Sequence, residues 1–428
     1  MPEVVVVGGG LAGCWAAVTA ARSGLKVVLV RRGPAATAMS SGALDMVPPS
    51  GAWEASAWLA RLPRDAADHP YLAGGAAPPP LAELEAEAGR LAAALGAAGL
   101  RLRVGLERPA LLAAVTGQLR HAGVAVESVA GGDLRELRRV AVAGIRGLLR
   151  TDADAVAAAI AQRLRIECRG VTLDLALPEL EDIAGDLDDA SVARAVEAPG
   201  GAEVLGEALA ATLGGGGVDL VLLPAVLGLE DSDRVRARVE AAGGIRVAEL
   251  LSPPPSAPGW RLARAAETMA RRAGVEVLTG SVTAVSCEGD RAVAVEVAGG
   301  ERLACEVLVL ATGSFLGGGL VADRRLREPL LGLPLFVDGR DAGSLSPRDL
   351  VERTRFAPQP FLAAGVRTDA SGRPVDGFDA PVLDNLVACG ALLAGLDTTL
   401  RSGGLGVAVW TAARAGRTAA RLRGVEAA

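Results

Sequence analysis

The sequence predicts an α/β protein built on a parallel sheet, with a β-meander and a large inserted α/β domain. Three observations support this prediction. A strand–glycine–helix unit stands at the start of the chain, buried strands alternate with helices through most of its length, and short strands separated by glycine turns occupy residues 282–303. With 428 residues the chain exceeds one typical hydrophobic core, so we expect more than one domain.

The first unit has the spacing of a nucleotide-binding turn. Val4–Val7 predicts a buried strand, residues 25–30 predict a second one, and the helix between them follows glycines in the pattern G-x-G-x-x-G: Gly8, Gly10 and Gly13. The first glycine permits a tight turn, the second lets a pyrophosphate approach the backbone, and the third lets the helix pack closely on the strand. The first helical N–H groups, including those of Leu11 and Ala12, would bind the phosphate. The unit therefore predicts a Rossmann-like FAD/NAD(P)-binding fold.

The usual anchor for an adenosine ribose is missing from this unit. Dinucleotide sites carry Asp or Glu about 20 residues past the glycines. Here the second strand ends in Arg31 and Arg32, and no acidic residue stands between Glu3 and Asp45. The ligand is therefore either a mononucleotide or a dinucleotide held in another way, and the two arginines could also bind a phosphate.

Composition argues against several classes of function. The net charge of −6 does not fit a general nucleic-acid-binding surface. The five cysteines are scattered and form no C-x-x-C pair, so we expect neither an iron–sulfur site nor a metal site. No apolar stretch reaches the roughly 20 residues of a membrane span, and the chain opens directly into a strand, without room for a signal peptide. We therefore expect a cytoplasmic chain with no transmembrane segment.

The rest of the chain continues the alternation of strands and helices. Strands are expected at 140–142, 171–175, 220–223, 245–250, 275–278, 307–313 and 385–390, with a meander at 282–285, 292–297 and 302–303. Helices are expected at 81–100, 152–164, 202–213, 232–242, 262–273 and 402–422. Pro253–Pro255 indicates a linker between two regions of the chain.

Several motifs resemble those of the B-subunit family of anaerobic glycerol-3-phosphate dehydrogenase, a group of flavoproteins with a two-dinucleotide-binding-type fold. The resemblance runs nearly from end to end and includes HPY at 69–71, LPEL at 177–180, LPAVLGL at 223–229, ATGSFLGGGLVA at 311–322, REPLLGL at 327–333 and FAPQP at 356–360. Near its end the family usually has QGCGGG, whereas this chain has RSGGLG at 401–406. The glycine character is kept, but a role for the Gln or Cys cannot be transferred.

This resemblance implies a cofactor, partners and a reaction. Family members contain FMN, which agrees with the missing ribose anchor, and FAD is the alternative. They work with two partners: an FAD-bearing catalytic subunit, and an iron–sulfur subunit that is associated with the membrane. Together they oxidise sn-glycerol 3-phosphate to dihydroxyacetone phosphate and pass electrons to quinone. The resemblance thus implies a peripheral position at the inner face of the membrane, held by a partner.

A flavin needs a phosphate cradle, a slot for its ring and control of charge near its 2-carbonyl. Two small polar loops could form the slot: Ser40, Ser41 and Gly42, and Thr312, Gly313 and Ser314. The start of the last helix could direct its dipole at the ring, through Gly403, Gly404 and Leu405. Asp397 could bind a ribityl hydroxyl. For the substrate, His69 is the candidate base, and Arg327 and Arg401 are candidate phosphate ligands.

From these elements we expect a discontinuous flavin-binding domain and an inserted region that faces substrate or partner. The flavin-binding domain would comprise residues 1–46, 259–322 and 380–428, and the inserted region residues 47–258 and 323–379. The chain could oxidise the substrate or only relay electrons. Two alternatives remain: a stand-alone FAD-dependent oxidoreductase of the fumarate reductase or aspartate oxidase type, and a non-catalytic scaffold subunit with a vestigial nucleotide fold.

Overall fold

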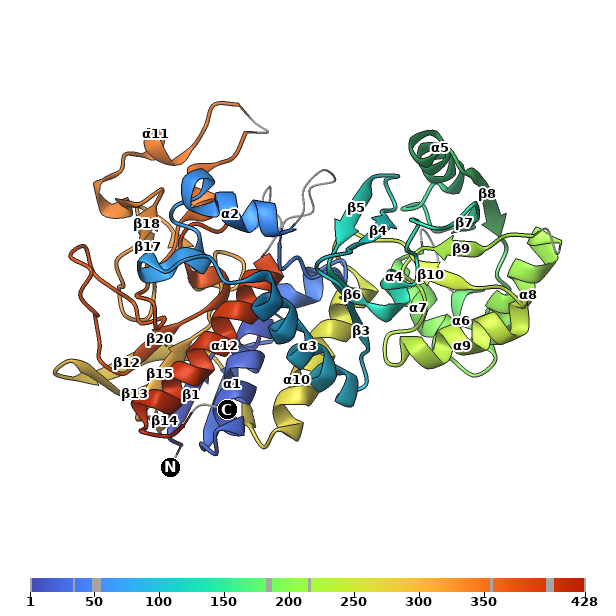
Figure 1. The fold of residues 1–428 in the computed structure, drawn as a ribbon. Helices are drawn as coiled ribbons and strands as arrows, with labels where there is room; N and C mark the ends of the chain where they lie inside the picture. The colour runs from blue at the N-terminus through green and yellow to red at the C-terminus, as the bar shows by residue number, and fades with distance from the viewer. Residues whose placement is uncertain are drawn as a thin grey trace.

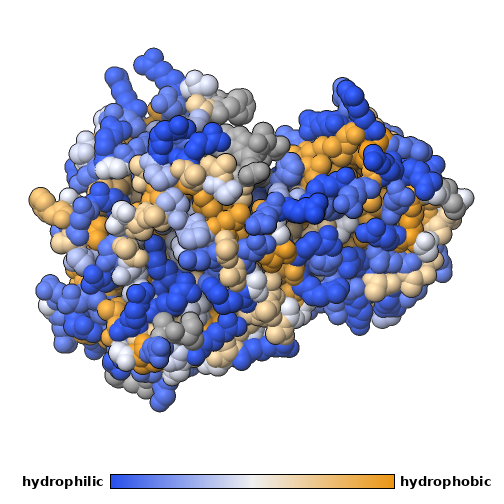
Figure 2. All heavy atoms as spheres, in the orientation of Figure 1, coloured by the Kyte–Doolittle hydropathy of each residue, from blue (hydrophilic) through white to orange (hydrophobic). Residues whose placement is uncertain are grey.

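The computed structural model describes residues 2–33, 35–47, 55–181, 187–214, 217–354, 357–397 and 404–426. Figure 1 shows two α/β units beside each other. Both ends of the chain, coloured blue and orange to red, lie in one unit, and the middle of the chain, in green, forms the other. On the face drawn in Figure 2, hydrophilic side chains cover most of both units.

The first unit is built on a parallel sheet of five strands. Their order is β11 (Glu276–Thr279), β2 (Val27–Arg31), β1 (Val4–Val7), β15 (Val307–Leu310) and β20 (Leu386–Ala388). The central strand β1 pairs with β2 on one side and with β15 on the other. Because all the pairings are parallel, the residues that follow these strands gather at one edge of the sheet.

Both faces of this sheet are covered, which explains why β1 carries no polar residue. On one face, Val4 and Val6 share a core with four helices: α1 (Leu11–Arg22), α3 (Leu81–Ala97), α10 (Ala257–Arg272) and α12 (Gly404–Leu422). On the other face, Val5 and Val7 share a core with the three-stranded antiparallel meander: β12 (Val282–Glu288), β13 (Arg291–Val297) and β14 (Glu301–Ala304).

The second unit contains a four-stranded parallel sheet. Its order is β10 (Val247–Glu249), β9 (Leu220–Leu223), β7 (Arg139–Ile145) and β8 (Glu167–Leu173). One face packs against α5 (Ala153–Leu164). The other packs against three helices: α7 (Asp189–Glu197), α8 (Gly201–Leu213) and α9 (Ser232–Gly243). This sheet therefore has a core of its own, separate from the core around β1.

Short elements connect these layers. The helical ones are η1 (Ala36–Met39), α2 (Ala55–Asp65), η2 (Pro70–Gly75), α4 (Glu127–Ala130), α6 (Pro178–Glu181), η3 (Ala342–Ser344), α11 (Pro347–Leu350), η4 (Pro360–Ala363) and η5 (Gly390–Leu392). The two-stranded sheets pair β3 (Leu102–Val104) with β6 (Val124–Val126), β4 (Ala110–Ala113) with β5 (Leu119–Ala122), β16 (Val321–Ala322) with β17 (Leu326–Arg327), and β18 (Phe336–Val337) with β19 (Arg340–Asp341).

The fold class and the order of the main elements are confirmed, with differences at the ends of elements. The helix expected to begin at residue 262 begins at Ala257, because the Ser256 side chain accepts a hydrogen bond from the Gly259 N–H and Pro258 fits the first turn. The prolines at 253–255 are therefore followed at once by this helix. The hairpins between residues 102 and 126 were not expected, because strands of three or four residues give little periodic signal.

A fully buried ion pair links the two units. Arg261 of α10 donates two hydrogen bonds to Glu249 at the end of β10, with N–O distances of 2.6 and 2.8 Å. Arg261 also donates to the carbonyl of Gly228 at 2.7 Å. The Ser128 hydroxyl and the Leu227 N–H donate to the same carboxylate at 2.7 and 2.8 Å. Burial opposes ionisation of Glu249, but the guanidinium and these hydrogen bonds hold its pKa below the ordinary value.

We predict that Glu249→Gln destabilises the protein by about 3–5 kcal/mol, because it leaves the buried Arg261 charge without its counter-ion. Glu203→Gln is the matched control, since it breaks a similar arginine pair, with Arg238, at the surface. That control should cost no more than about 1 kcal/mol. Urea unfolding of the wild type and the two variants measures both changes, and equal losses for the two variants would contradict the role of the buried pair.

Candidate functional site

The glycine turn after β1 is packed so tightly that a side chain at Gly8 or Gly13 would overlap a backbone carbonyl oxygen. Gly8 has a φ of +123°, and a Cβ there would lie 2.1 Å from the carbonyl oxygen of Ala311, which follows β15. A Cβ on Gly13 would lie 1.8 Å from the carbonyl oxygen of Gly8. These contacts confirm the tight turn and the close helix–strand packing that the spacing predicts.

The second glycine of the pattern begins the helix. Gly10 is the N-cap residue of α1, and a Cβ there would lie 3.4 Å from the Cβ of Ala35 and 3.5 Å from Oγ1 of Thr37. Thr37 also accepts a hydrogen bond of 2.9 Å from the Leu11 N–H. The start of α1 is therefore bounded by the segment that follows β2. Thr37 is not among the residues predicted for the site, although its place in the loop after β2 is a usable signal.

The residues at this edge of the sheet suit a phosphorylated cofactor. The Thr312 hydroxyl is buried and has no hydrogen-bond partner in the described part of the chain. A Cβ on Gly390, after β20, would approach the Cβ of Ala12 to 2.7 Å, so a third strand end also reaches the helix start. A helix N-terminus, a glycine turn and an unsatisfied hydroxyl together fit the phosphate and hydroxyl groups of a nucleotide cofactor.

The loop at 40–42 packs against protein. The Ser40 hydroxyl accepts a hydrogen bond of 3.1 Å from the Gly42 N–H. Gly42 has a φ of +88°, and a Cβ there would lie 2.7 Å from Pro258. A Cβ on Gly259 would lie 2.4 Å from the Ser40 carbonyl oxygen. Gly42 is thus required for the contact with α10, and a cofactor contact from Ser40, Ser41 or Gly42 stays a prediction.

In the loop after β15, the backbone of Gly319 packs against that of Gly313 and Ser314. Gly313 has a φ of +77°, and a Cβ on Gly319 would lie 1.9 Å from the Gly313 carbonyl oxygen. The Gly319 N–H donates to the Ser314 carbonyl at 3.1 Å. Arg32 is exposed, and its guanidinium lies beside the same turn, 3.5 Å from where a Cβ of Gly318 would stand. Cofactor contacts from Gly313, Ser314 and Arg32 stay predictions.

The last helix begins at Gly404, close to the expected position. A Cβ on Gly406 would lie 2.1 Å from the Asp45 carbonyl oxygen, so the first turn of α12 packs on the loop after η1. Leu405 packs against the helical core, and Asp397 is buried. Arg401 and Gly403 lie outside the described residues. Roles of Asp397, Gly404 and Leu405 in cofactor binding stay predictions.

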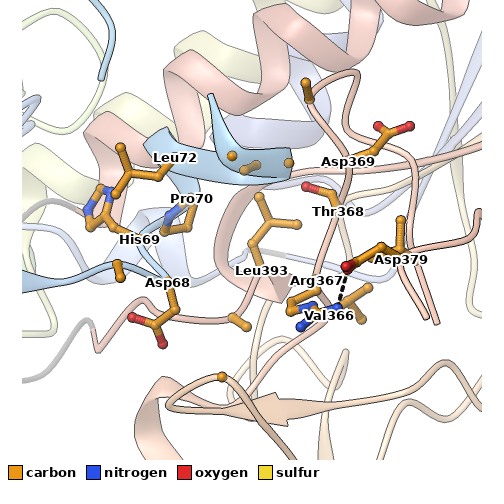
Figure 3. Close-up of a pocket in the computed structure, with 18 of the residues that line it drawn as sticks. Asp68, His69, Pro70, Leu72, Val366, Arg367, Thr368, Asp369, Asp379 and Leu393 are labelled. Atoms are coloured by element: carbon orange, nitrogen blue, oxygen red, sulfur yellow. Dashed lines mark hydrogen bonds and ion pairs between the residues drawn. The ribbon is translucent and has the colours of Figure 1, made fainter. Parts of the chain in front are cut away.

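A cavity of about 960 Å³ is lined by His69 (Figure 3). The cavity is bounded by η2, by the loop at 366–371 and by Leu393. His69 is 9% exposed as a residue, and its ring packs edge-on against Tyr71, with 4.7 Å between ring centroids. Its Nδ1 accepts the Tyr71 N–H at 3.2 Å, so the neutral ring carries its proton on Nε2. The histidine expected as a base therefore does line a cavity.

Aspartates are the most frequent charged residues in the described lining of this cavity, and three of them, Asp65, Asp369 and Asp379, are paired with arginines. Its described lining includes five aspartates: Asp65, Asp68, Asp338, Asp369 and Asp379. Arg367 lines it too, but its guanidinium pairs with Asp379, as the dashed line in Figure 3 marks. Arg327 is not among the described lining residues; its side chain is 51% exposed on the hairpin β16–β17 and pairs with Asp323 at 3.1 Å. These aspartates are not among the residues predicted for the site, because they come from segments that are distant in the sequence.

Comparison with known proteins identifies the family. The FAD binding domain family matches residues 3–407. The B subunit of anaerobic glycerol-3-phosphate dehydrogenase from Yersinia enterocolitica is 31% identical over 96% of each chain. The same protein from Pectobacterium carotovorum is 30% identical over 96% of each chain. Among solved structures, 3-ketosteroid delta1-dehydrogenase from Sterolibacterium denitrificans covers 98% of this chain and 99% of its own, with 13% identity and a TM-score of 0.45.

The comparison changes the expectation about the flavin. The family that matches is described by its binding of FAD, and it gives no support to FMN. The expectation of FMN came from the family resemblance, with which the missing acid after β2 agreed, and that absence does not by itself exclude a dinucleotide.

We predict that Gly10→Glu abolishes flavin binding, because its carboxylate would repel a phosphate at the start of α1, beside Ala35 and Thr37. Gly89→Glu is the control, since Gly89 lies exposed on α3 and a Cβ there would meet nothing within 4 Å. The visible flavin absorbance of the purified proteins reports the result. If the Gly10→Glu variant retains a full complement of flavin, the glycine turn does not bind the cofactor phosphate.

Proposed function

The chain belongs to the B-subunit family of anaerobic glycerol-3-phosphate dehydrogenase, and we propose that it is a flavoprotein subunit of a glycerol-3-phosphate dehydrogenase complex. The complex would oxidise sn-glycerol 3-phosphate to dihydroxyacetone phosphate and pass the electrons to quinone. The observation that carries this proposal is the similarity to the B subunit over 96% of both chains. The intact glycine turn supports a working cofactor site and argues against a vestigial scaffold.

We propose FAD as the flavin, since the matching family is one of FAD binding domains. Gly8–Gly13 and the start of α1 would hold its phosphates, and the Thr312 hydroxyl would donate to a polar cofactor group. The dipole of α12 would favour negative charge near its N-terminus at Gly404. When bound, the flavin would accept and release the electrons of the reaction.

The charge of the cavity favours electron relay over substrate oxidation on this chain. Glycerol 3-phosphate is an anion, and a site for it needs unpaired cations or free N–H donors. Aspartates dominate the cavity lining, and Arg367, which also lines it, is paired with Asp379. The described lining therefore offers a substrate phosphate no arginine that is free of a counter-ion. We infer that the substrate is oxidised on a different, FAD-bearing catalytic subunit of the complex.

The remaining assignments depend on this complex. An iron–sulfur subunit would take the electrons onward and hold the assembly at the inner face of the membrane. Within the described residues, none of the helices has the length and apolarity that a membrane span requires. If this chain does oxidise the alcohol, His69 is the base, with Arg327 and Arg401 as candidate phosphate ligands. The domain division at residues 46, 259, 322 and 380 belongs to the same proposal.

The isolated chain should oxidise glycerol 3-phosphate only weakly with an artificial electron acceptor, and its catalytic and iron–sulfur partners should restore turnover. The physical reason is that the described lining of the cavity offers no unpaired arginine to a substrate phosphate. Dye reduction by the chain alone, by the catalytic partner alone and by the assembled complex measures this. Fast turnover by the isolated, flavin-loaded chain would contradict the proposal that this chain only relays electrons. No increase in turnover when this chain is added to its partners would contradict its membership of the complex.

A further inference from the structure

Arg31 stands where nucleotide-binding folds usually place the ribose-binding acid. It is the last residue of β2, and its side chain runs across the glycine turn. A Cβ on Gly9 would lie 2.5 Å from the Cβ of Arg31 and 3.2 Å from its Cδ. Because Gly9 has no side chain, the side chain of Arg31 can lie against the backbone of the glycine turn. The position that normally supplies an acceptor supplies a donor here.

A carboxylate reaches this position from elsewhere in the chain. Glu267 of α10 forms an ion pair with Nη1 of Arg31 through its Oε2. Its Oε1 accepts a hydrogen bond of 2.9 Å from the more exposed Arg271, one turn further along the helix. The side chains of Arg31 and Glu267 are only 21% and 26% exposed. The sequence between Glu3 and Asp45 has no acidic residue, and the tertiary structure places the carboxylate of Glu267 at the end of β2 instead.

The pair also has an unused donor. Nε of Arg31 is buried and has no hydrogen-bond partner among the described residues. A buried N–H without an acceptor costs free energy, so such a group calls for a partner that the chain itself does not supply. A ribose hydroxyl can accept from this donor and donate to a carboxylate, which matches the two members of the pair.

We propose that Arg31 and Glu267 together anchor the adenosine ribose of FAD, in place of the single acid at the end of β2. This inference rests on the proposed function, because it assumes that the glycine turn holds a flavin. Arg31, Arg271 and Glu267 together carry a net positive charge, so charge alone does not select between a free ribose and a phosphorylated one. FMN has no adenosine and would not use the pair.

The test compares Arg31→Gln with Arg271→Gln in the full chain stripped of cofactor. Both variants remove one guanidinium partner of Glu267, but only the first removes the donor beside Gly9. Titration with FAD and with FMN, followed by flavin fluorescence, gives dissociation constants without any need for activity. Arg31→Gln should weaken FAD binding about tenfold to a hundredfold and leave FMN binding within about twofold. Arg271→Gln should leave both nearly unchanged.

A second variant guards against a folding defect. Glu267→Gln should also weaken FAD binding selectively, and circular dichroism should show native secondary structure in all three variants. Equal FAD affinity for wild type and Arg31→Gln overturns the proposal, as does an equal loss of FAD and FMN affinity. If the wild-type chain binds no flavin at all, the proposed function itself fails. Flavin binding that is indifferent to Arg31 and Glu267 instead refutes only this inference.

Discussion

The approach of three backbone segments at Gly8 and Gly13 is the constraint on which the rest of the structure depends. β1, β15 and the start of α1 come so close there that a methyl group would overlap a carbonyl oxygen. This packing seats α1 on the sheet, and α1 in turn packs against α10 and α12. The parallel order of the strands then brings Arg31, Thr312 and Gly390 to the same edge. Any side chain at the two glycines would separate these parts.

The helix α10 connects this edge with the middle unit. Its first turn packs on Ser40 through Gly259, its second turn carries the buried Arg261 that reaches Glu249 in the other unit, and Glu267 meets Arg31 at the end of β2. These contacts lie at successive positions along 16 residues. The placement of the middle unit and the surroundings of the cradle are therefore fixed by the same element.

Local sequence signals predicted the parts of the fold that depend on local chemistry. Four valines followed by spaced glycines predicted β1 and α1, and the runs at 220–223 and 307–310 predicted buried strands. Contacts between distant segments left no such signal. Glu267 pairs with Arg31, and Asp65 lines the same cavity as Asp379. Neither the residue types nor their spacing in the sequence predicts these contacts. Glu267, the acid that we propose for the ribose site, therefore could not be found from the sequence around β2.

Release and identification of the cofactor tests the central claim most directly. The chain, purified under mild conditions and then denatured, should release FAD, identified by mass spectrometry and close to one flavin per chain. Such a result would agree with the glycine cradle, with the unsatisfied Thr312 hydroxyl and with the Arg31–Glu267 pair as parts of one dinucleotide site. A chain that copurifies with no flavin and takes up none when FAD is added would contradict the account.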